Sequence, residues 1–365
     1  MRKWFGGLTG LSIVALLLAL VLQPASADRG VPGSQEFGFG SVLYLDDATL
    51  SQGLALASEL RGDWIYIPVS MDQVFPAPGK ANLAALDQAM KVAAKRKMAV
   101  ALSLTAAPDW AMTEQGPNPL QTAALVRFLV ERYPVALKAV ELFPRANTRI
   151  GWGAPANPTA YMQMFLAVKN DLQSTSSPVL LVGAGLQPVA GQAAAGDIDD
   201  LQFLQSLYEA GAQTQMPVVS IQYPQLSGEP LSPPVLAENR VLRHYEQVRQ
   251  VMTDNGHQSG LIWITRLNLP TGAINPDDAK YQDEYEQSTW LQEAYGQIRS
   301  QLYIGAAFLQ SFNPGVEPGC VSLLRSDGTY HLYYEYLKTL LGQNMADDRE
   351  SPGRPKSGIL EKDRK

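Results

Sequence analysis

The sequence predicts a single α/β domain with the (β/α)8 architecture of a TIM barrel, spanning residues 37–342. Strand-like and helix-like segments alternate eight times across this range, and the strand-like segments are nearly continuous apolar runs. Such runs are typical of parallel strands that helices bury on both faces. An open, doubly wound sheet is the alternative, but the glycine-rich turn that usually follows its first strand is missing from the sequence.

The first four repeats of this alternation fill residues 37–173. Their expected strands are short apolar runs, at residues 37–44, 64–69, 99–104 and 139–143. Their expected helices carry apolar residues at helical spacing, at residues 50–60, 83–97, 120–133 and 158–173. Asn82 stands where its side chain would cap the second of these helices.

The last four repeats continue the same pattern to residue 341. Their expected strands are residues 179–185, 218–222, 261–265 and 304–309. Their expected helices are residues 201–210, 236–255, 283–302 and 330–341. In a barrel of this kind all strands point the same way, and residues just past their carboxyl ends carry the chemistry.

Both ends of the chain differ from the barrel in composition. Met1-Arg2-Lys3, an apolar run from Leu8 to Leu22 and the Ala25-Ser26-Ala27 site predict a secretory signal peptide at residues 1–27, cut after Ala27. The apolar run is shorter than the roughly 20 residues of a membrane span. We therefore expect a secreted or cell-envelope protein that meets the membrane only where this segment stays uncleaved. Residues 28–36 are expected to form a linker, and the polar residues 343–365 a disordered tail.

Composition excludes several classes of function. The formal net charge is −6 with acidic and basic residues interspersed, so the chain lacks the basic stripe of a nucleic-acid binder. His244, His257 and His331 are scattered without metal-ligand spacing, and no phosphate-binding glycine loop occurs. We therefore expect no metal and no other cofactor. The single cysteine, Cys320, rules out an intramolecular disulfide.

Five short motifs lie at the second, third, fifth and seventh predicted strands and before the last predicted helix. They are Val74-Phe75-Pro76-Ala77-Pro78-Gly79, Pro108-Asp109-Trp110-Ala111, Gly183-Ala184-Gly185-Leu186, Ile262-Trp263-Ile264-Thr265 and Leu323-Leu324-Arg325-Ser326-Asp327-Gly328. In their order and spacing they resemble motifs of the retaining (β/α)8 glycoside hydrolases, a group that includes cellulase-like and xylosidase-like secreted enzymes. The resemblance covers residues 37–341 and implies the same barrel.

The resemblance also locates the positions where that family carries its two catalytic carboxyl groups, which lie about 5–5.5 Å apart in retaining enzymes. The family's fourth strand ends W-E-x-W-N-E-P, and the matching run is Val140-Glu141-Leu142-Phe143-Pro144-Arg145-Ala146. Its seventh strand ends W-x-T-E, and the matching run is Trp263-Ile264-Thr265-Arg266. By this resemblance Arg145 replaces the general acid/base and Arg266 replaces the nucleophile.

Arginine can serve neither role, because it stays protonated at working pH and is no nucleophile. Other polar positions of the family differ as well. Tyr66 stands where an arginine is frequent, Gln222-Tyr223-Pro224 where H-x-Y-P-like runs are common, and Gln310-Ser311-Phe312 where a tryptophan is usual. The pattern predicts a barrel with no catalytic residues at the family's positions.

Acids in loops leave open the alternative of an active hydrolase with relocated carboxylates. The loop acids that follow strands are Asp46, Asp47, Asp72, Asp109, Glu229 and Glu317. Asp72 and Asp109 follow neighbouring strands and are the pair best placed to reach the mouth of the barrel. The plainer interpretation is that such acids cap helices, fix turns or neutralise the arginines.

Arg145 and Arg266 are the leading candidates for ligand binding, through forked hydrogen bonds to a uronate, sulfate or phosphate group. Alternatively, they pair with Glu141, Asp72 or Asp109 and close the cavity in which the resembling family has its active site. The other candidate ligand contacts are Asp72, Asp109, Trp110, Trp152, Gln222, Tyr223 and Phe312, with the aromatic rings serving as stacking faces for a sugar or as loop anchors. The expected partner is a carbohydrate or an anionic glycan. A purely structural cell-envelope protein with a filled barrel mouth is the third hypothesis.

Overall fold

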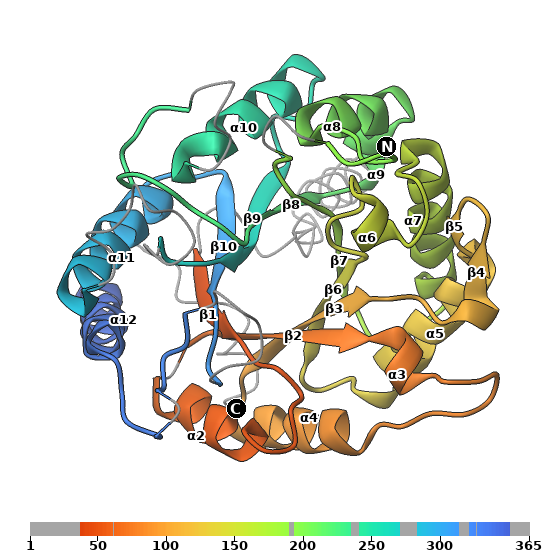
Figure 1. The fold of residues 1–365 in the computed structure, drawn as a ribbon. Helices are drawn as coiled ribbons and strands as arrows, with labels where there is room; N and C mark the ends of the chain where they lie inside the picture. Colours follow the sequence, from red (N-terminus) through yellow and green to blue (C-terminus); the bar gives the residue numbers. More distant parts are fainter. Residues whose placement is uncertain are drawn as a thin grey trace, which may run out of the picture. The chain divides into compact units, whose positions relative to one another are not determined.

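Eight parallel strands close into a barrel, and the helices that connect them lie on its outer face (Figure 1). The computed structural model describes residues 37–60, 62–189, 193–234, 241–270, 283–313, 321–325 and 327–350, with side chains to residue 341. The barrel strands are β1 Gly38–Val42, β2 Trp64–Ser70, β3 Ala99–Thr105, β6 Leu137–Leu142, β7 Leu180–Leu186, β8 Val218–Tyr223, β9 Leu261–Leu267 and β10 Ile304–Leu309. They are hydrogen-bonded in the order β1-β10-β9-β8-β7-β6-β3-β2, which confirms the predicted fold class.

Each barrel strand is followed by a covering helix. These helices are α2 Leu50–Leu60, α4 Ala84–Arg96, α5 Pro119–Arg132, α7 Pro158–Leu172, α8 Asp200–Glu209, α10 Tyr245–Asp254, α11 Glu284–Arg299 and α12 Leu332–Glu350. Short elements lie in the connecting segments: α3 Met71–Val74, η1 Asp109–Ala111, the hairpin of β4 Met112–Thr113 and β5 Gly116–Pro117, α6 Arg149–Trp152, α9 Ala212–Gln215 and η2 Leu242–His244.

Local sequence explains where several helices begin. Asn118 caps α5, since its side-chain oxygen accepts hydrogen bonds from the backbone N–H groups of Leu120 and Gln121, both at 3.1 Å. Asn157 caps α7 in the same way, and a proline occupies the first helical position in both. This combination satisfies otherwise unpaired N–H groups and presets the helical backbone.

Several helix boundaries differ from those expected. Asn82 makes no cap, because α4 begins one residue later and its N-cap residue is Leu83, whose side chain cannot accept a hydrogen bond. Residues 236–240 of the helix expected at 236–255 lie outside the described residues, and from Leu242 the chain forms η2 and then α10. The last helix, expected to end at residue 341, runs to Glu350.

The signal peptide at 1–27, the linker at 28–36 and the end of the tail at 351–365 lie outside the described residues. Within the described part of the chain, no helix has the length and apolar character needed to cross a membrane.

Large aromatic side chains fill the amino-terminal half of the barrel interior. The rings of Trp64 and Trp263 meet edge to face at 5.2 Å, and Trp263 lies 5.8 Å from Phe308. Glycines beside them leave the necessary room, because a Cβ at Gly38 would lie 2.7 Å from Trp64 Nε1 and one at Gly305 would lie 2.9 Å from Trp263 Nε1. The interior is therefore a packed core at this end rather than a channel.

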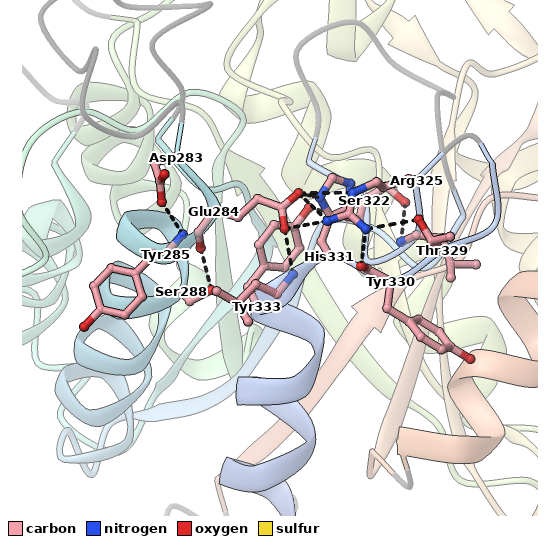
Figure 2. Close-up of polar contacts among 12 residues, drawn as sticks. Asp283, Glu284, Tyr285, Ser288, Ser322, Arg325, Thr329, Tyr330, His331 and Tyr333 are labelled. Carbon is pink, nitrogen blue, oxygen red and sulfur yellow. Dashed lines mark hydrogen bonds and ion pairs between the residues drawn. The ribbon is translucent and has the colours of Figure 1, made fainter.

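An ion-pair cluster around Glu284 fastens the last helix to its neighbour (Figure 2). Arg325 Nη2 donates hydrogen bonds to both oxygens of Glu284, each at 2.7 Å. His331 Nδ1 lies 2.7 Å from Glu284 Oε1, and the backbone N–H of Leu332 donates to Oε2 at 2.9 Å. Since Glu284 begins α11 and Leu332 begins α12, one carboxylate holds the starts of both helices. Arg325 belongs to the motif before the last helix, so that motif has a structural role here.

The same cluster predicts an acid-sensitive contribution to stability. Partial burial raises the pKa of Glu284, but hydrogen bonds from Arg325, Leu332 and His331 outweigh burial and lower this pKa from 4.5 to about 2. A lowered pKa gives stability that is fully present above pH 4.5 and is lost as the pH falls through about 2. Because the side chains are about one-third exposed, we expect Glu284→Gln to lower the free energy of unfolding by only about 1 kcal/mol at pH 7.

Urea denaturation at pH 7 and at pH 3 measures this effect. Glu293→Gln, an exposed change on the same helix, is the matched control and should differ from the parent protein by less than about 0.5 kcal/mol at both pH values. The gap between the parent protein and Glu284→Gln should narrow on acidification. A gap of the same size at pH 3 as at pH 7 would contradict the role given to Glu284.

Candidate functional site

Polar side chains from five strands meet inside the barrel around the carboxylate of Glu141, which is 1 % exposed. Glu141 Oε2 accepts hydrogen bonds from the Tyr66 hydroxyl and from Ser103 Oγ, the latter at 2.7 Å. Glu141 Oε1 accepts one from Thr265 Oγ1 at 2.7 Å. Gln222 Nε2 lies 3.5 Å from the Tyr66 hydroxyl and 3.4 Å from Thr265 Oγ1. We call these five residues the Glu141 network.

The alternation of side chains along a strand places this network. Successive residues of a strand point to opposite faces, so Tyr66 points inward two positions after Trp64, and Thr265 does so two positions after Trp263. The polar layer therefore lies one inward-facing position closer to the carboxyl ends than the aromatic layer. Burial raises the pKa of Tyr66 well above 10, and the negative charge of Glu141 raises it further, so Tyr66 remains a hydrogen-bond donor.

Two arginines lie at the carboxyl ends of the strands, in the mouth of the barrel. Arg145 follows β6, and Arg266 lies near the end of β9. Both are partly buried. Arg266 Nε donates a hydrogen bond to Gln310 Oε1 at 2.8 Å, and Gln310 Nε2 donates in turn to the Tyr44 hydroxyl at 2.6 Å. This relay fixes the direction of the Arg266 guanidinium.

The guanidinium of Arg145 forms no hydrogen bond and no ion pair with the residues that the structure describes. Burial lowers the pKa of Arg145, and the positive charge of Arg266 lowers it further. Partly buried cations normally have a charged or hydrogen-bonding partner, since removal from water is unfavourable for the charged form. The electrostatic influence of Tyr66 and Tyr44 opposes these two effects but does not outweigh them, so the pKa of Arg145 stays below its usual value.

The backbone around Arg145 is held in a rarely populated conformation. Four residues at or near the carboxyl ends of β3, β6 and β7 have positive φ angles. They are Ala106 at +45°, Phe143 at +49°, Arg145 at +62° and Ala184 at +76°. The Arg145 N–H donates to the carbonyl of Gly185 at 2.7 Å, which ties the segment after β6 to β7. Backbone strain of this kind persists where the surroundings impose it, and it gathers at functional sites.

Asp72 and Asp109 are exposed, and neither forms a hydrogen bond with a residue of the Glu141 network. Asp72 lies in the first turn of α3, where its Oδ1 accepts hydrogen bonds from Ser70 Oγ and from the backbone N–H of Gln73. Asp109 begins η1. Neither carboxylate forms an ion pair with either arginine, nor does Glu141, and no hydrogen bond joins Asp72 to Asp109 within the described part of the chain.

Three of the four candidate aromatic rings lie in the core. Trp152 and Tyr223 are 1 % exposed and Phe312 is 2 % exposed. Trp152 donates a hydrogen bond from Nε1 to the carbonyl of Gln115 at 2.7 Å. Trp110 is half-buried and donates to the carbonyl of Phe75 at 2.9 Å. These rings therefore anchor loops and pack the shell in this structure rather than offering a face on which a sugar could stack.

The structure adds partners that sequence reasoning missed. Tyr66, Ser103 and Thr265 bind the Glu141 carboxylate, where the sequence suggested the arginines as partners. Tyr44 and Gln310 support Arg266. Apolar strands carry no alternation that shows which residues face inward, so the three hydroxyl groups could not be assigned to Glu141 from the sequence. The Tyr44–Gln310 contact depends on the closure of the barrel between β1 and β10.

The arrangement provides cationic hydrogen-bond donors at the mouth and a single carboxylate beneath them. Among the described residues, Glu141 and Asp200 are the fully buried acids, and Asp200 pairs with His244 outside the barrel interior. No group of histidine, cysteine or acidic side chains in the described part has the geometry of a metal site. The guanidinium of Arg145 offers hydrogen-bond donors to a ligand, and its chemistry matches a carboxylate, sulfate or phosphate.

Comparison with known proteins places the fold. No protein-family model matches the chain, and no curated protein matches it in sequence. Among solved structures, a family 39 glycoside hydrolase from Bacteroides cellulosilyticus WH2 superposes with a TM-score of 0.62 at 16 % identity, over 85 % of this chain and 64 % of that one. A glucosidase from Croceicoccus marinus gives a TM-score of 0.64 at 13 % identity, over 86 % and 69 % of the two chains.

Xylanase 10B from Thermotoga maritima is also similar, with a TM-score of 0.56 at 12 % identity over 86 % of this chain and 97 % of the xylanase. The chain spans less than two-thirds of the family 39 enzyme's length. At these identities the likeness concerns the fold, and it agrees with the eight-stranded parallel barrel described above. The protein thus has a (β/α)8 barrel, a fold that it shares with these glycoside hydrolase structures.

Proposed function

We propose that this protein is a catalytically inactive, glycoside-hydrolase-like barrel that binds an anionic ligand at its mouth, with the charged group of a carbohydrate as the leading candidate. The observation that carries the proposal is the partly buried guanidinium of Arg145, which has no partner among the described residues and lies within the field of Arg266. An anion in forked hydrogen bonds with Arg145 would supply the missing counter-charge.

Inactivity is proposed from the residues at the strand ends. The sequence resemblance assigns Arg145 and Arg266 to the positions of the acid/base and the nucleophile, and arginine supports neither role. Glu141, the buried carboxylate inside the barrel, already accepts three hydrogen bonds. Paired carboxylates are the chemical requirement for ordinary glycoside hydrolysis. Apart from Glu141, the fully buried acid among the described residues is Asp200, which is paired with His244.

Anion binding predicts a ligand-dependent gain in stability. Glucuronate, sulfate or phosphate should raise the thermal unfolding temperature, and glucose, which is uncharged, should not. A ligand at 100 times its dissociation constant adds about 2.7 kcal/mol to the free energy of unfolding. Arg145→Gln should weaken binding about 10- to 100-fold, the loss expected for one charge-assisted hydrogen-bonded contact.

Two comparisons make this experiment specific. Arg96→Gln, an exposed change at the end of α4, should bind like the parent protein. Without ligand, Arg145→Gln should be equally stable or more stable than the parent, because it removes a partly buried cation beside another cation. Absence of any anion-dependent stabilisation, or stabilisation that survives in Arg145→Gln, would overturn the proposed site.

Turnover assays separate the proposal from an active hydrolase. A panel of aryl glycosides and polysaccharides should show no hydrolysis above the uncatalysed rate. Hydrolysis that disappears in Asp72→Ala or Asp109→Ala would instead support relocated carboxylates. We also propose that the protein is exported, as its N-terminal sequence suggests, and a mature chain that begins at Asp28 outside the cytoplasm would support this.

A further inference from the structure

Five acidic side chains follow three neighbouring strands on one side of the barrel mouth. β1, β2 and β3 are adjacent in the barrel, and β6, which leads into Arg145, is next to β3. The acids that follow β1, β2 and β3 before the next covering helix are Asp46, Asp47, Asp72, Asp109 and Glu114. We call them the acidic crescent.

The acidic crescent is not neutralised by the protein groups that the structure describes. None of its five carboxylates takes part in an ion pair with the described residues, and Asp47, Asp72, Asp109 and Glu114 are exposed. The same three segments contain one cation, Lys80. By contrast, the segment from Phe143 to Asn157 contains Arg145 and Arg149 and no acid. At the carboxyl ends of the strands, the segment after β6 therefore carries cations, and the segments after the adjoining strands carry carboxylates without ion-pair partners among the described residues.

We infer that the mouth selects a neutral saccharide that carries one anionic group and disfavours polyanionic chains. This inference rests on the proposed anion site at Arg145 and adds the class of ligand. A polymer bound through an internal charged residue extends from Arg145 in two directions, and its other charges then approach the acidic crescent. A neutral saccharide with a single terminal carboxylate places its only charge at the guanidinium and has no further charge to be repelled.

The expected preference for a singly charged saccharide over a polyanion is modest, because the charges of the acidic crescent are mostly exposed. Between exposed charges several ångströms apart, repulsion in water is weak for each pair, and it is screened over about 8 Å at physiological ionic strength. Several such pairs together give a preference of about 10-fold at low salt, and the preference should shrink as salt is added. Salt dependence is therefore part of the expected result.

Titration calorimetry tests the inference with two probes of equal length. One is a neutral xylo-oligosaccharide that carries a single terminal glucuronic acid, and the other is an oligogalacturonate, in which every residue is charged. At 50 mM salt the singly charged probe should bind about 10-fold more tightly, and at 500 mM salt the two affinities should converge to within about threefold. Equal affinity, or tighter binding of the oligogalacturonate at low salt, would overturn the inference.

A double variant of the crescent provides the second measurement. Asp47→Asn with Glu114→Gln removes two carboxylates that make no side-chain hydrogen bond with described residues. It should tighten oligogalacturonate binding about threefold and change binding of the singly charged probe by less than twofold, by the same screened repulsion. Glu131→Gln with Glu293→Gln, on α5 and α11, is the matched control and should change neither. An unchanged ratio in the crescent variant would count against selection by these acids.

The outcomes distinguish an error in the ligand class from an error in the proposed anion site. If anions bind in an Arg145-dependent manner but without preference for the singly charged probe, the ligand class is wrong and the anion site stands. If neither probe binds, or if Arg145→Gln leaves both affinities unchanged, the proposed function itself fails.

Discussion

Glu141→Ala is expected to lower the free energy of unfolding by about 4 kcal/mol, because it removes the acceptor shared by three buried hydroxyl groups. Tyr66, Ser103 and Thr265 all donate to this carboxylate, and each of the three is at most 3 % exposed. A buried donor left without a partner costs about 1–3 kcal/mol, and the cavity left by the truncated side chain adds to the loss.

Urea denaturation followed by tryptophan fluorescence measures this change. Glu131→Ala, an exposed acid on α5, is the control and should stay within about 0.5 kcal/mol of the parent protein. Glu141→Gln should fall between the two, because an amide keeps the volume and one acceptor oxygen but turns an NH2 group toward hydroxyl donors. A loss below about 1.5 kcal/mol in Glu141→Ala would mean that the hydroxyls find other acceptors, in conflict with the network described here.

The comparison of Glu141→Gln with the parent protein also separates architecture from binding. If the Glu141 network only supports the mouth, its conservative variant should lose stability while the affinity for anions changes by less than about threefold, which corresponds to less than about 0.7 kcal/mol. A larger change in affinity would place Glu141 among the groups that a ligand senses. Either result refines the assignment of Arg145 as the primary anion contact.

The sequence predicted the barrel because its main signal is local. A strand buried on both faces is an apolar run, and eight such runs separated by helices leave few other folds. Helix ends were less predictable, since capping depends on single positions: Asn118 and Asn157 cap their helices, whereas Asn82 lies one residue too early to do so.

The candidate site was less predictable because its contacts join distant parts of the chain. Thr265 and Glu141 are 124 residues apart in sequence, and Tyr66 and Glu141 are 75 apart. Which face of a strand a residue occupies also decides its role. Gln222 points into the barrel, so Tyr223 points into the shell, where it packs as a core residue. Apolar runs carry no alternation that would reveal this orientation, so the aromatic candidates could not be sorted from the sequence.

A buried pair between Asp200 and His244 leads to the second large expected effect. Asp200 is the first residue of α8 and His244 ends η2, so the pair joins the segments after β7 and β8. His244 Nε2 lies 2.6 Å from Asp200 Oδ2, and its Nδ1 lies 2.6 Å from Gln247 Oε1. Both side chains are fully buried. Two acceptors facing the two ring nitrogens suit a doubly protonated imidazole.

Asp200→Asn should lower the free energy of unfolding by about 3 kcal/mol at pH 5.5, because it leaves a buried charge without its partner. Burial lowers the pKa of His244, but the hydrogen bond and charge of Asp200 outweigh burial, so its pKa lies above 6.5. A raised pKa gives stability that is fully present below pH 6.5 and is lost as the pH rises through the folded-state value. The gap between the parent protein and Asp200→Asn should therefore narrow between pH 5.5 and pH 9.

Denaturation at these two pH values, with Glu209→Gln as the control on the same helix, distinguishes the ion pair from simple packing. A packing defect would cost the same at both pH values, whereas loss of a charged pair would cost more at the lower one. A double-mutant cycle of Asp200→Asn with His244→Gln tests the pair directly. If each substitution removes the same interaction, their coupling free energy at pH 5.5 should be about 2 kcal/mol or more. Independent effects at pH 5.5 would show that His244 is neutral in the folded protein, and the segments after β7 and β8 would then be joined by hydrogen bonding without charge.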